Sequence, residues 1–505
     1  MNTELSEQEI IRRKSLEELT RLGINAYPAA EYKVTHLAEK LREEFETHPE
    51  SLQDARVAGR IMRRRIMGSA SFFELQDASG RIQVYVTRDD VSRDEEKTMY
   101  NVVFKKLLDI GDIVGVSGFV FRTRTGELSV HARELTVLSK SLRPLPVVKE
   151  KDGQVYDAFS DPEQRYRQRY LDLIVNPRAK EVFVKRSGVI NAIRAYLTDA
   201  GCLEMDTPVL QAIPGGASAR PFITHHNALD VPFYLRVANE LYLKRLIVGG
   251  FDGVFEFSRN FRNEGMDRSH NPEFTVMEVY VAYKDYFWMM DFTEKMIAAT
   301  ARAVNGNTLA PFGDNLVDFA PPYKRVRMVD AIREHAGIDV TGKSEQELRD
   351  FCLANDIRVD NKMGKGKLID AIFGEKCEHH YIQPTFIYDY PVEMSPLTKM
   401  HRSEPGMTER FELMVNGKEL ANAYSELNDP IDQLERFKEQ MALSERGDDE
   451  AMFIDRDFLR ALEYGMPPTS GMGIGIDRLC MFLTNSPSIQ DVLLFPQMKP
   501  ETNQD

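Results

Sequence analysis

The sequence has few of the features that mark a secreted or membrane-bound protein. Only four of its 505 residues are cysteines, and they lie far apart without the spacing of a zinc or redox site, so we expect reduced thiols. No apolar run approaches the roughly 20 residues of a membrane span. The first residues also lack the basic and then apolar pattern of a signal peptide. These absences predict a cytoplasmic protein that does not associate with a membrane.

Positive charge is scarce as well. The formal net charge is −14, which argues against a protein that coats nucleic acid along its whole surface. A local nucleic-acid site remains compatible with this charge, because such a site needs only one basic face.

The chain divides by pattern into three stretches. At roughly 100–200 residues per domain, its length predicts two to four domains. The first stretch is polar and helical, and Ser6 with Glu9 can form a capping box. In the second, alternation at Ile82, Val84 and Val86 indicates short strands, about five of which fit a small barrel of the OB type. The third mixes helices and strands. The predicted divisions are 1–55, 56–143 and 144–505, with a helical insertion near 325–385.

Two strand-like segments, 254–262 and 274–282, are joined by a long polar loop. Because side chains alternate between faces, Arg262 lies on one face of the first strand, and Glu278 and Tyr280 share a face of the second. Such a face with a polar loop above it is typical of a binding surface. An ordinary half-buried hairpin with one solvated face would show the same alternation.

The segment Glu412–Glu426 is the second candidate. Asn416-Gly417 predicts a type I′ turn, and regular pairing then places Met414 opposite Glu419, so that Glu412 and Glu419 lie diagonally on one face. Two such carboxylates suit Mg²⁺, although two exposed acids on a surface hairpin would look alike. Strict alternation places Asn422 and Glu426 on the opposite face, and a bulge must break the register if all four serve one site.

The glycine-rich run 471–478 is the third candidate. Its glycines allow close backbone approach, and Arg478 would open a helix, which suits phosphate binding. A dinucleotide-binding interpretation fails, because no βαβ unit with a following acidic residue fits before the chain ends.

In order and content these elements resemble the three motifs of the class II aminoacyl-tRNA synthetases. The first is the helix ending at Gly201 with the strand around Pro208. The second runs from Phe261-Arg262-Asn263-Glu264-Gly265 to Thr275, and the third is Gly473-Ile474-Gly475-Ile476-Asp477-Arg478. Within the class the chain is most similar to the lysyl-tRNA synthetases, through the segments 214–217, 219–222, 224–227 and 425–429.

The resemblance implies an α+β fold, with an amino-terminal OB-fold β-barrel that binds the anticodon and a catalytic antiparallel sheet flanked by helices. It implies that L-lysine is activated by ATP to lysyl-adenylate and transferred to tRNA(Lys), and that the enzyme is a homodimer with Pro208 in its interface. Arg262 and Arg478 would be catalytic. The residues implied to bind ATP are Arg262, Glu264, His270, Asn271, Phe274 and Arg478.

The same resemblance assigns the amino-acid and metal sites. Glu412 and Glu419 would bind Mg²⁺, with up to three ions per subunit. Phe72 and Gln83 would contact the anticodon, and the run 63–65 could meet phosphates or be a solvated strand end. The lysine-binding residues implied are Gly216, Glu240, Glu278, Tyr280, Asn422 and Glu426.

Three other interpretations are open at this point. Sister enzymes for aspartate or asparagine share the motifs, but Glu426 and Tyr280 suit an ammonium rather than an acidic substrate. A paralogue that lysylates a protein resembles the catalytic domain alone. A non-catalytic RNA-binding module would not need Arg262, Glu412, Glu419 and Arg478.

Overall fold

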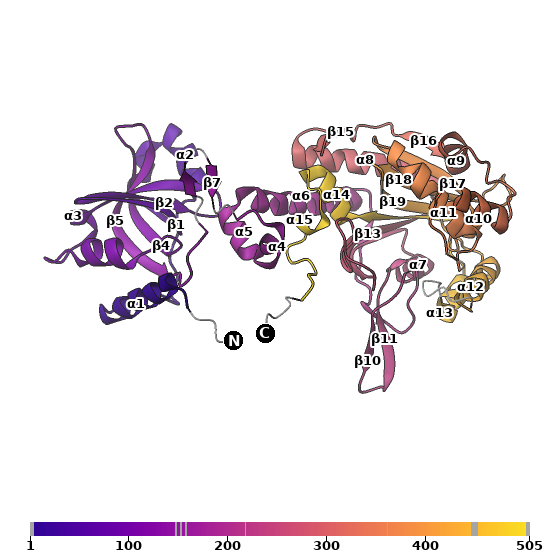
Figure 1. Cartoon of the computed structure of the whole chain (residues 1–505), viewed down its shortest axis with the longest axis horizontal. Coiled ribbons are helices and arrows are strands. Elements are labelled where there is room, and N and C mark those ends of the chain that lie inside the picture. The colour runs from indigo at the N-terminus through magenta and orange to yellow at the C-terminus, as the bar shows by residue number, and fades with distance from the viewer. Residues whose placement is uncertain are drawn as a thin grey trace. The chain divides into compact units, whose positions relative to one another are not determined.

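The structure is a computed structural model that describes residues 5–146, 149–151, 154–156, 159–217, 219–360, 362–445 and 453–500. The chain folds as two compact units, Met1–Ser160 and Asp161–Asp505, which are treated separately (Figure 1). Among the described residues, no helix has the length and apolar character that a membrane span requires.

The first unit contains a closed five-stranded barrel, as the sequence predicts. Its strands follow the order β1-β2-β3-β5-β4, with β3 and β5 parallel and the other neighbours antiparallel. Alternation produces the core, since every second residue of β2 and β3 is buried. The strands are β1 (Ala55–Met67), β2 (Ala70–Gln76), β3 (Arg81–Thr87), β4 (Ile113–Arg122) and β5 (Leu128–Ser139), and a small hairpin of β6 (Lys149–Lys151) and β7 (Gln154–Tyr156) follows.

The helical extension before the barrel is interrupted. The predicted capping box of Ser6 and Glu9 starts the first helix, and Gly23, with φ +74°, follows its end. Residues 22–37 form no regular element before the second helix begins. The helical segments of this unit are α1 (Glu7–Arg21), α2 (Ala38–Thr47), η1 (Pro49–Asp54), α3 (Arg88–Val91) and the π-helix η2 (Met99–Leu107).

An eight-stranded sheet organises the second unit, in the order β16-β17-β18-β19-β20-β13-β12-β8. Its neighbours are antiparallel except at the two ends, where β16 with β17 and β12 with β8 are parallel. The strands are β8 (Leu203–Glu204), β12 (Gly253–Phe261), β13 (Glu273–Ala282), β16 (Lys324–Arg327), β17 (Thr385–Pro391), β18 (Met407–Val415), β19 (Lys418–Ser425) and β20 (Thr469–Gly475).

One face of this sheet is covered by helices. Phe255, Met277, Ala423 and Ile474 point to the same apolar core as residues of α6, α8 and α14. The opposite face is therefore left for the polar side chains that alternate with them. The helices of this unit are α4 (Pro162–Arg167), α5 (Arg169–Val175), α6 (Pro177–Asp199), α7 (Glu240–Val248), α8 (Tyr286–Asn305), α9 (Met328–Ala336), α10 (Glu345–Ala354), α11 (Lys365–Lys376), η3 (Glu378–His380), η4 (Val392–Met394), α12 (Pro430–Glu445), α13 (Arg456–Glu463), α14 (Ile476–Thr484) and α15 (Ile489–Val492).

The helices α9, α10 and α11 lie within the stretch 325–385. They connect the parallel neighbours β16 and β17 and share an apolar core with residues of β17 and β18. A parallel pair needs a long crossover of this kind. Smaller sheets lie elsewhere in the unit, and the hairpin of β10 and β11 extends away from the main sheet (Figure 1). These sheets comprise β9 (Leu210–Gln211), β10 (Ile223–His226) and β11 (Val231–Leu235), and separately β14 (Leu309–Phe312) and β15 (Asn315–Asp318).

Candidate active site

The hairpin of β12 and β13 carries the centre of the site. Asn260 pairs with Phe274, and Glu256 pairs with Glu278, so the face predicted from alternation is the face that the structure forms. Glu278 is buried, with 6% of its surface exposed. The polar residues of β13 therefore lie in an enclosed pocket and not on a solvated surface.

A first cavity of about 550 Å³ lies at the end of this hairpin. Arg262 extends over the Phe274 ring, with its guanidinium carbon 5.1 Å from the ring centre. Its Nε is buried and has no hydrogen-bonding partner among the described residues. Arg478, the third residue of α14, donates a hydrogen bond to the carbonyl oxygen of Glu419. Both predicted catalytic arginines line this cavity.

The three loop residues of the predicted ATP site also line the first cavity. Glu264 is exposed. His270 Nδ1 lies 2.9 Å from Asp267 Oδ2. The Asn271 amide donates to the Glu273 carbonyl at 2.6 Å and accepts from the Gln497 backbone N–H at 3.2 Å, so this side chain also fixes the loop.

A second cavity of about 870 Å³ adjoins the first, because Arg262, Phe274, Gly475 and Arg478 line both. Five of the six predicted lysine-binding residues line it, and Glu419 joins them. The five are Gly216, Glu240, Glu278, Tyr280 and Asn422.

Glu426, the sixth, lies directly behind the cavity wall and is 2% exposed. A methyl group placed on Gly471, which lines the cavity, would meet Glu426 Oε1 at 2.1 Å and the Tyr280 ring at 2.4 Å. The absence of a side chain at Gly471 therefore leaves room for the Glu426 carboxylate beside the cavity. Tyr280 itself donates its hydroxyl to Glu278 Oε2 at 2.8 Å.

The carboxylates of this pocket are strongly influenced by burial. Burial and the neighbouring Glu240 raise the pKa of Glu278 to about 8. Burial also raises the pKa of Glu426 well above its usual value, and the Lys244 ammonium opposes that rise. A cationic ligand would relieve the repulsion among these groups.

Two side chains of this pocket were missed by the sequence prediction. Lys244 on α7 forms ion pairs with Glu240 and Glu426, and the Tyr424 hydroxyl donates to Glu240 Oε2 at 2.7 Å. The spacing of Glu240 and Lys244 on one helix face was the available signal for the first contact. Tyr424 lies two residues after Asn422 in the same strand, so the alternation of side chains predicts that the two share a face.

A bulge in β19 places Glu419 and Asn422 on the same face of the strand. Leu413 pairs with Ala421 and Met414 pairs with Glu419, which leaves Leu420 without a partner. The predicted pairing of Met414 with Glu419 is confirmed, and so is the break in register that a common site requires. Glu419 and Asn422 consequently both line the second cavity.

Glu412 faces this arrangement from β18, where it pairs with Asn422. Burial and the Glu419 carboxylate raise the pKa of Glu412 to about 8. Arg410 donates to Glu412 Oε1 at 2.5 Å and to Asn422 Oδ1 at 3.1 Å, and so fixes both side chains. Two mutually repelling carboxylates with hard oxygen donors fit a divalent cation such as Mg²⁺.

The predicted anticodon residues lie on neighbouring strands of the barrel. The Phe72 ring packs 4.9 Å from the Tyr85 ring, and Gln83 donates to Ser129 Oγ at 2.8 Å. In the basic run 63–65, Arg64 donates to the carbonyls of Phe104 and Leu108. Arg64 is therefore committed to the barrel, whereas its two neighbours in the run are exposed.

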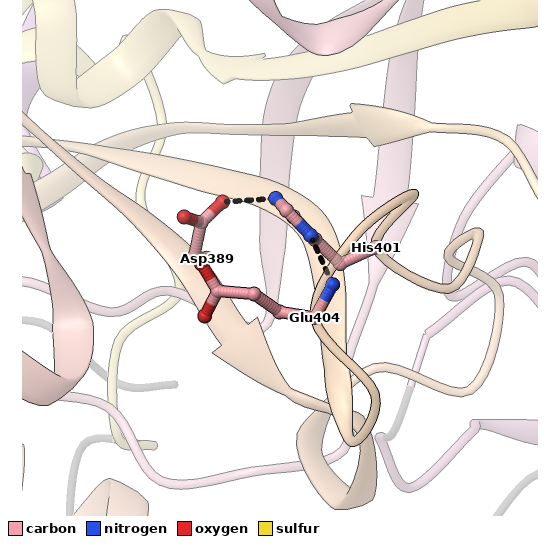
Figure 2. Close-up of side chains that lie close together, drawn as sticks. All are labelled: Asp389, His401 and Glu404. Carbon is pink, nitrogen blue, oxygen red and sulfur yellow. Dashed lines mark hydrogen bonds and ion pairs between the residues drawn. The ribbon is translucent and has the colours of Figure 1, made fainter.

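Asp389, His401 and Glu404 form a separate cluster, in which one ligand atom of each residue lies within 4.8 Å of the others (Figure 2). Arg327 donates to Asp389 at 3.1 Å and also forms an ion pair with Glu404. The Tyr286 hydroxyl donates to Asp389 at 2.9 Å. One arginine thus forms ion pairs with both carboxylates of this cluster.

Comparison with known proteins agrees with this architecture. Residues 161–499 match the family described as tRNA synthetases class II (D, K and N), and residues 55–138 match the OB-fold nucleic acid binding domain. The first match alone covers more than half of the chain.

Curated relatives match over almost the whole length. A lysine–tRNA ligase of Porphyromonas gingivalis is 67% identical over 499 residues, which cover 99% of this chain and 86% of the relative. One of Christiangramia forsetii is 63% identical, covering 99% and 87%. One of Azobacteroides pseudotrichonymphae is 61% identical, covering 98% and 99%. The chain therefore belongs to the class II tRNA synthetases and, within them, to the lysine–tRNA ligase family.

Proposed function

We propose that this enzyme activates L-lysine with ATP, forming lysyl-adenylate and pyrophosphate, and then transfers the lysyl group to the 3′ end of tRNA(Lys). The observation that carries the proposal is the pair of adjoining cavities. The two share two arginines and an aromatic ring where they meet, and the second is also bordered by three buried carboxylates.

The first cavity suits ATP. Phe274 offers a ring on which adenine can stack, and Arg478 is available for the other face of the base and for the γ-phosphate. Arg262 has a buried Nε without a partner, and a phosphate or carboxylate oxygen would supply one. Glu264, His270 and Asn271 border the same cavity and complete the nucleotide site.

The second cavity suits lysine. Gly216 and Glu240 would receive the α-ammonium, and Asn422 would orient the carboxylate toward Arg262. Glu426, Tyr280 and Glu278 would receive the ε-ammonium at the far end. An uncharged side chain would leave Glu426 Oε1, which has no hydrogen-bonding partner among the described residues, unsatisfied, and leaving a buried charge without such a partner costs about 3–5 kcal/mol. That is enough to reject methionine or leucine.

The reaction needs no general base, because the lysine carboxylate is already a nucleophile. One of its oxygens attacks the α-phosphorus of ATP, the bond to the β-phosphate bridging oxygen breaks, and pyrophosphate leaves. Arg262 would hold the carboxylate and the α-phosphate in line and neutralise the charge that develops between them. The 3′-hydroxyl of the tRNA terminal adenosine then attacks the acyl carbon and releases AMP.

Glu412 and Glu419 would hold Mg²⁺, up to three ions per subunit. When bound, Mg²⁺ neutralises charge on the phosphates. Arg410 supports this role, since it orients Glu412 and Asn422 together.

The barrel would bind the anticodon of tRNA(Lys). Phe72 offers a ring for stacking, and Gln83 offers an amide that can read a base edge. We further propose that the enzyme is a homodimer joined through the region of Pro208. Two apolar residues near it, Leu203 and Leu210, are 53% and 49% exposed, as unpaired interface residues would be.

We place the enzyme in the cytoplasm. Its four cysteines are all buried and unpaired, which suits a reducing compartment.

ATP–pyrophosphate exchange with lysine, aspartate and asparagine in turn tests the substrate. We expect exchange with lysine alone, and strong exchange with aspartate but not lysine would refute the proposal. Charging of tRNA in vitro tests the second step, because an enzyme that lysylates a protein would form the adenylate but leave tRNA uncharged.

A further inference from the structure

Lys244 is a cation buried inside the proposed lysine pocket. Its side chain is 0% exposed. Nζ lies 2.5 Å from Glu240 Oε1 and forms a second ion pair with Glu426 Oε2. The rings of Tyr424 and Phe458 lie 5.4 Å and 6.0 Å from Nζ. The ammonium therefore has carboxylates and aromatic faces around it instead of water.

Stability alone does not explain a buried lysine ammonium. Taking an ammonium out of water is costly, and apolar residues of similar volume often stabilise a protein as well as a buried ion pair does. A role in the pocket explains why a lysine stands at this position.

Lys244 contacts one carboxylate oxygen of each of its two partners and leaves the other oxygen for a different contact. In Glu426, Oε2 contacts Lys244, while Oε1 has no hydrogen-bonding partner among the described residues and lies beside Gly471 at the cavity wall. In Glu240, Oε1 contacts Lys244 and Oε2 accepts from the Tyr424 hydroxyl. One cation thus orients the two carboxylates proposed for the two ends of lysine.

We propose that Lys244 is a positioning residue for amino-acid recognition, whose ammonium holds the carboxylates of Glu240 and Glu426 in the orientation that lysine requires. This inference rests on the proposed function, since it assigns those two carboxylates to the substrate's ammonium groups.

The charges of the pocket support the assignment. Burial raises the pKa of Glu278 to about 8, so this carboxyl group is largely protonated at neutral pH. Lys244 contacts the other two carboxylates, Glu240 and Glu426, and its ammonium opposes the rise that burial causes in the pKa of Glu426.

The elements packed around Lys244 supply the other charged and polar groups near it. Glu240 comes from α7, Tyr424 comes from β19, Glu426 is the residue directly after that strand, and Tyr280 and Glu278 come from β13. On β12, Glu256 is already paired with Arg236 at 2.7 Å, and α13 contributes the uncharged Phe458. On α7 itself, Arg245 is paired with Asp455 and Asp457. Among the described residues, Lys244 is the cation that forms ion pairs with Glu240 and Glu426.

The test is the pH dependence of lysine use in Lys244→Met, measured by ATP–pyrophosphate exchange without tRNA. Without the ammonium, which lowers the pKa of Glu426, Glu426 takes up a proton more readily, and the ε-ammonium of lysine must displace that proton on binding. We expect kcat/KM for lysine to fall about 100-fold or more near pH 7, and to rise more steeply toward about pH 9 than in the wild type. The KM for ATP should change by less than about threefold.

Lys244→Arg should restore the shape of the wild-type pH profile, because it restores the charge. Lys140→Met is the matched control. Lys140 is equally buried between two carboxylates, Asp109 at 2.6 Å and Asp112 at 2.9 Å, but belongs to the first unit. Its loss should lower the melting temperature without changing the KM or the pH profile for lysine.

A folded Lys244→Met with the wild-type KM and pH profile for lysine would overturn the inference. If that variant does not fold, Lys244→Gln, which is also neutral but polar, decides the matter by the same two readouts. Absence of lysine exchange in the wild-type enzyme would instead refute the proposed function, so the two failures are distinguishable.

Discussion

Gly471→Ala is the sharpest test of the lysine pocket, because a single methyl group is added where the structure has no room for it. The new carbon would lie 2.1 Å from Glu426 Oε1 and 2.4 Å from the Tyr280 ring. Contacts below 3.0 Å are essentially never seen at a Cβ, so the carboxylate has to move by about 1 Å in a densely packed interior.

A misplacement of about 1 Å in a positioning group can cost about 100-fold in rate, which corresponds to about 2.7 kcal/mol of transition-state stabilisation. We therefore expect kcat/KM for lysine in ATP–pyrophosphate exchange to fall about 100-fold, with the KM for ATP nearly unchanged. The lysine and ATP measurements report on the lysine and nucleotide parts of the site separately, because Glu426 does not line the first cavity.

Gly188→Ala serves as the control for the added methyl group. It lies on α6, where the new carbon would only touch Val304 at 3.5 Å. Its activity should equal that of the wild type. Unchanged lysine kinetics in a folded Gly471→Ala protein would show that the Glu426 carboxylate is not used for lysine.

Three further predictions follow from the site. Arg262→Ala should abolish lysyl-adenylate formation while leaving the melting temperature within a few degrees of the wild type, and near-normal exchange would contradict the role of this arginine. Glu278 has a pKa of about 8 in the folded protein against an ordinary 4.5, so between these pH values the folded state holds a proton that the unfolded state has lost. The free energy of unfolding should therefore decrease as pH rises through that window, by at most about 1.4 kcal/mol per pH unit. Urea unfolding of Glu278→Gln should show a weaker decrease, and identical slopes would refute the assignment. Phe72→Ala should raise the KM for tRNA(Lys) in charging about 5- to 160-fold, as the loss of about 1–3 kcal/mol of stacking predicts, while exchange without tRNA stays unchanged.

Local rules predicted much of the fold and of the site. Alternation placed Glu278 and Tyr280 on the face that borders the cavity. The Asn416-Gly417 turn has φ of 49° and 67°, as a type I′ turn requires. The capping box at Ser6 formed as expected. In each case, residues close in sequence determine the geometry.

Features that depend on distant residues were not predictable in the same way. The contact of Lys244 with Glu426 joins α7 to the residue that follows β19, and only the packing of the sheet against that helix brings them together. The sequence required a break in the register of β19, but its position at Leu420 depends on how both neighbouring strands pair. The helical stretch 325–385 was recognisable, whereas its role as a crossover between β16 and β17 required the strand order.

The unpaired Leu420 has a consequence for which mutations this enzyme can tolerate. Its side chain is 2% exposed and packs in the core, so another apolar residue of similar volume should be accepted there. Deleting the residue would remove the bulge, and Glu419 and Asn422 would then be two positions apart and still on one face of the strand. What the enzyme requires of this stretch is therefore a shared face for Glu419 and Asn422, which both an apolar substitution at Leu420 and its deletion preserve.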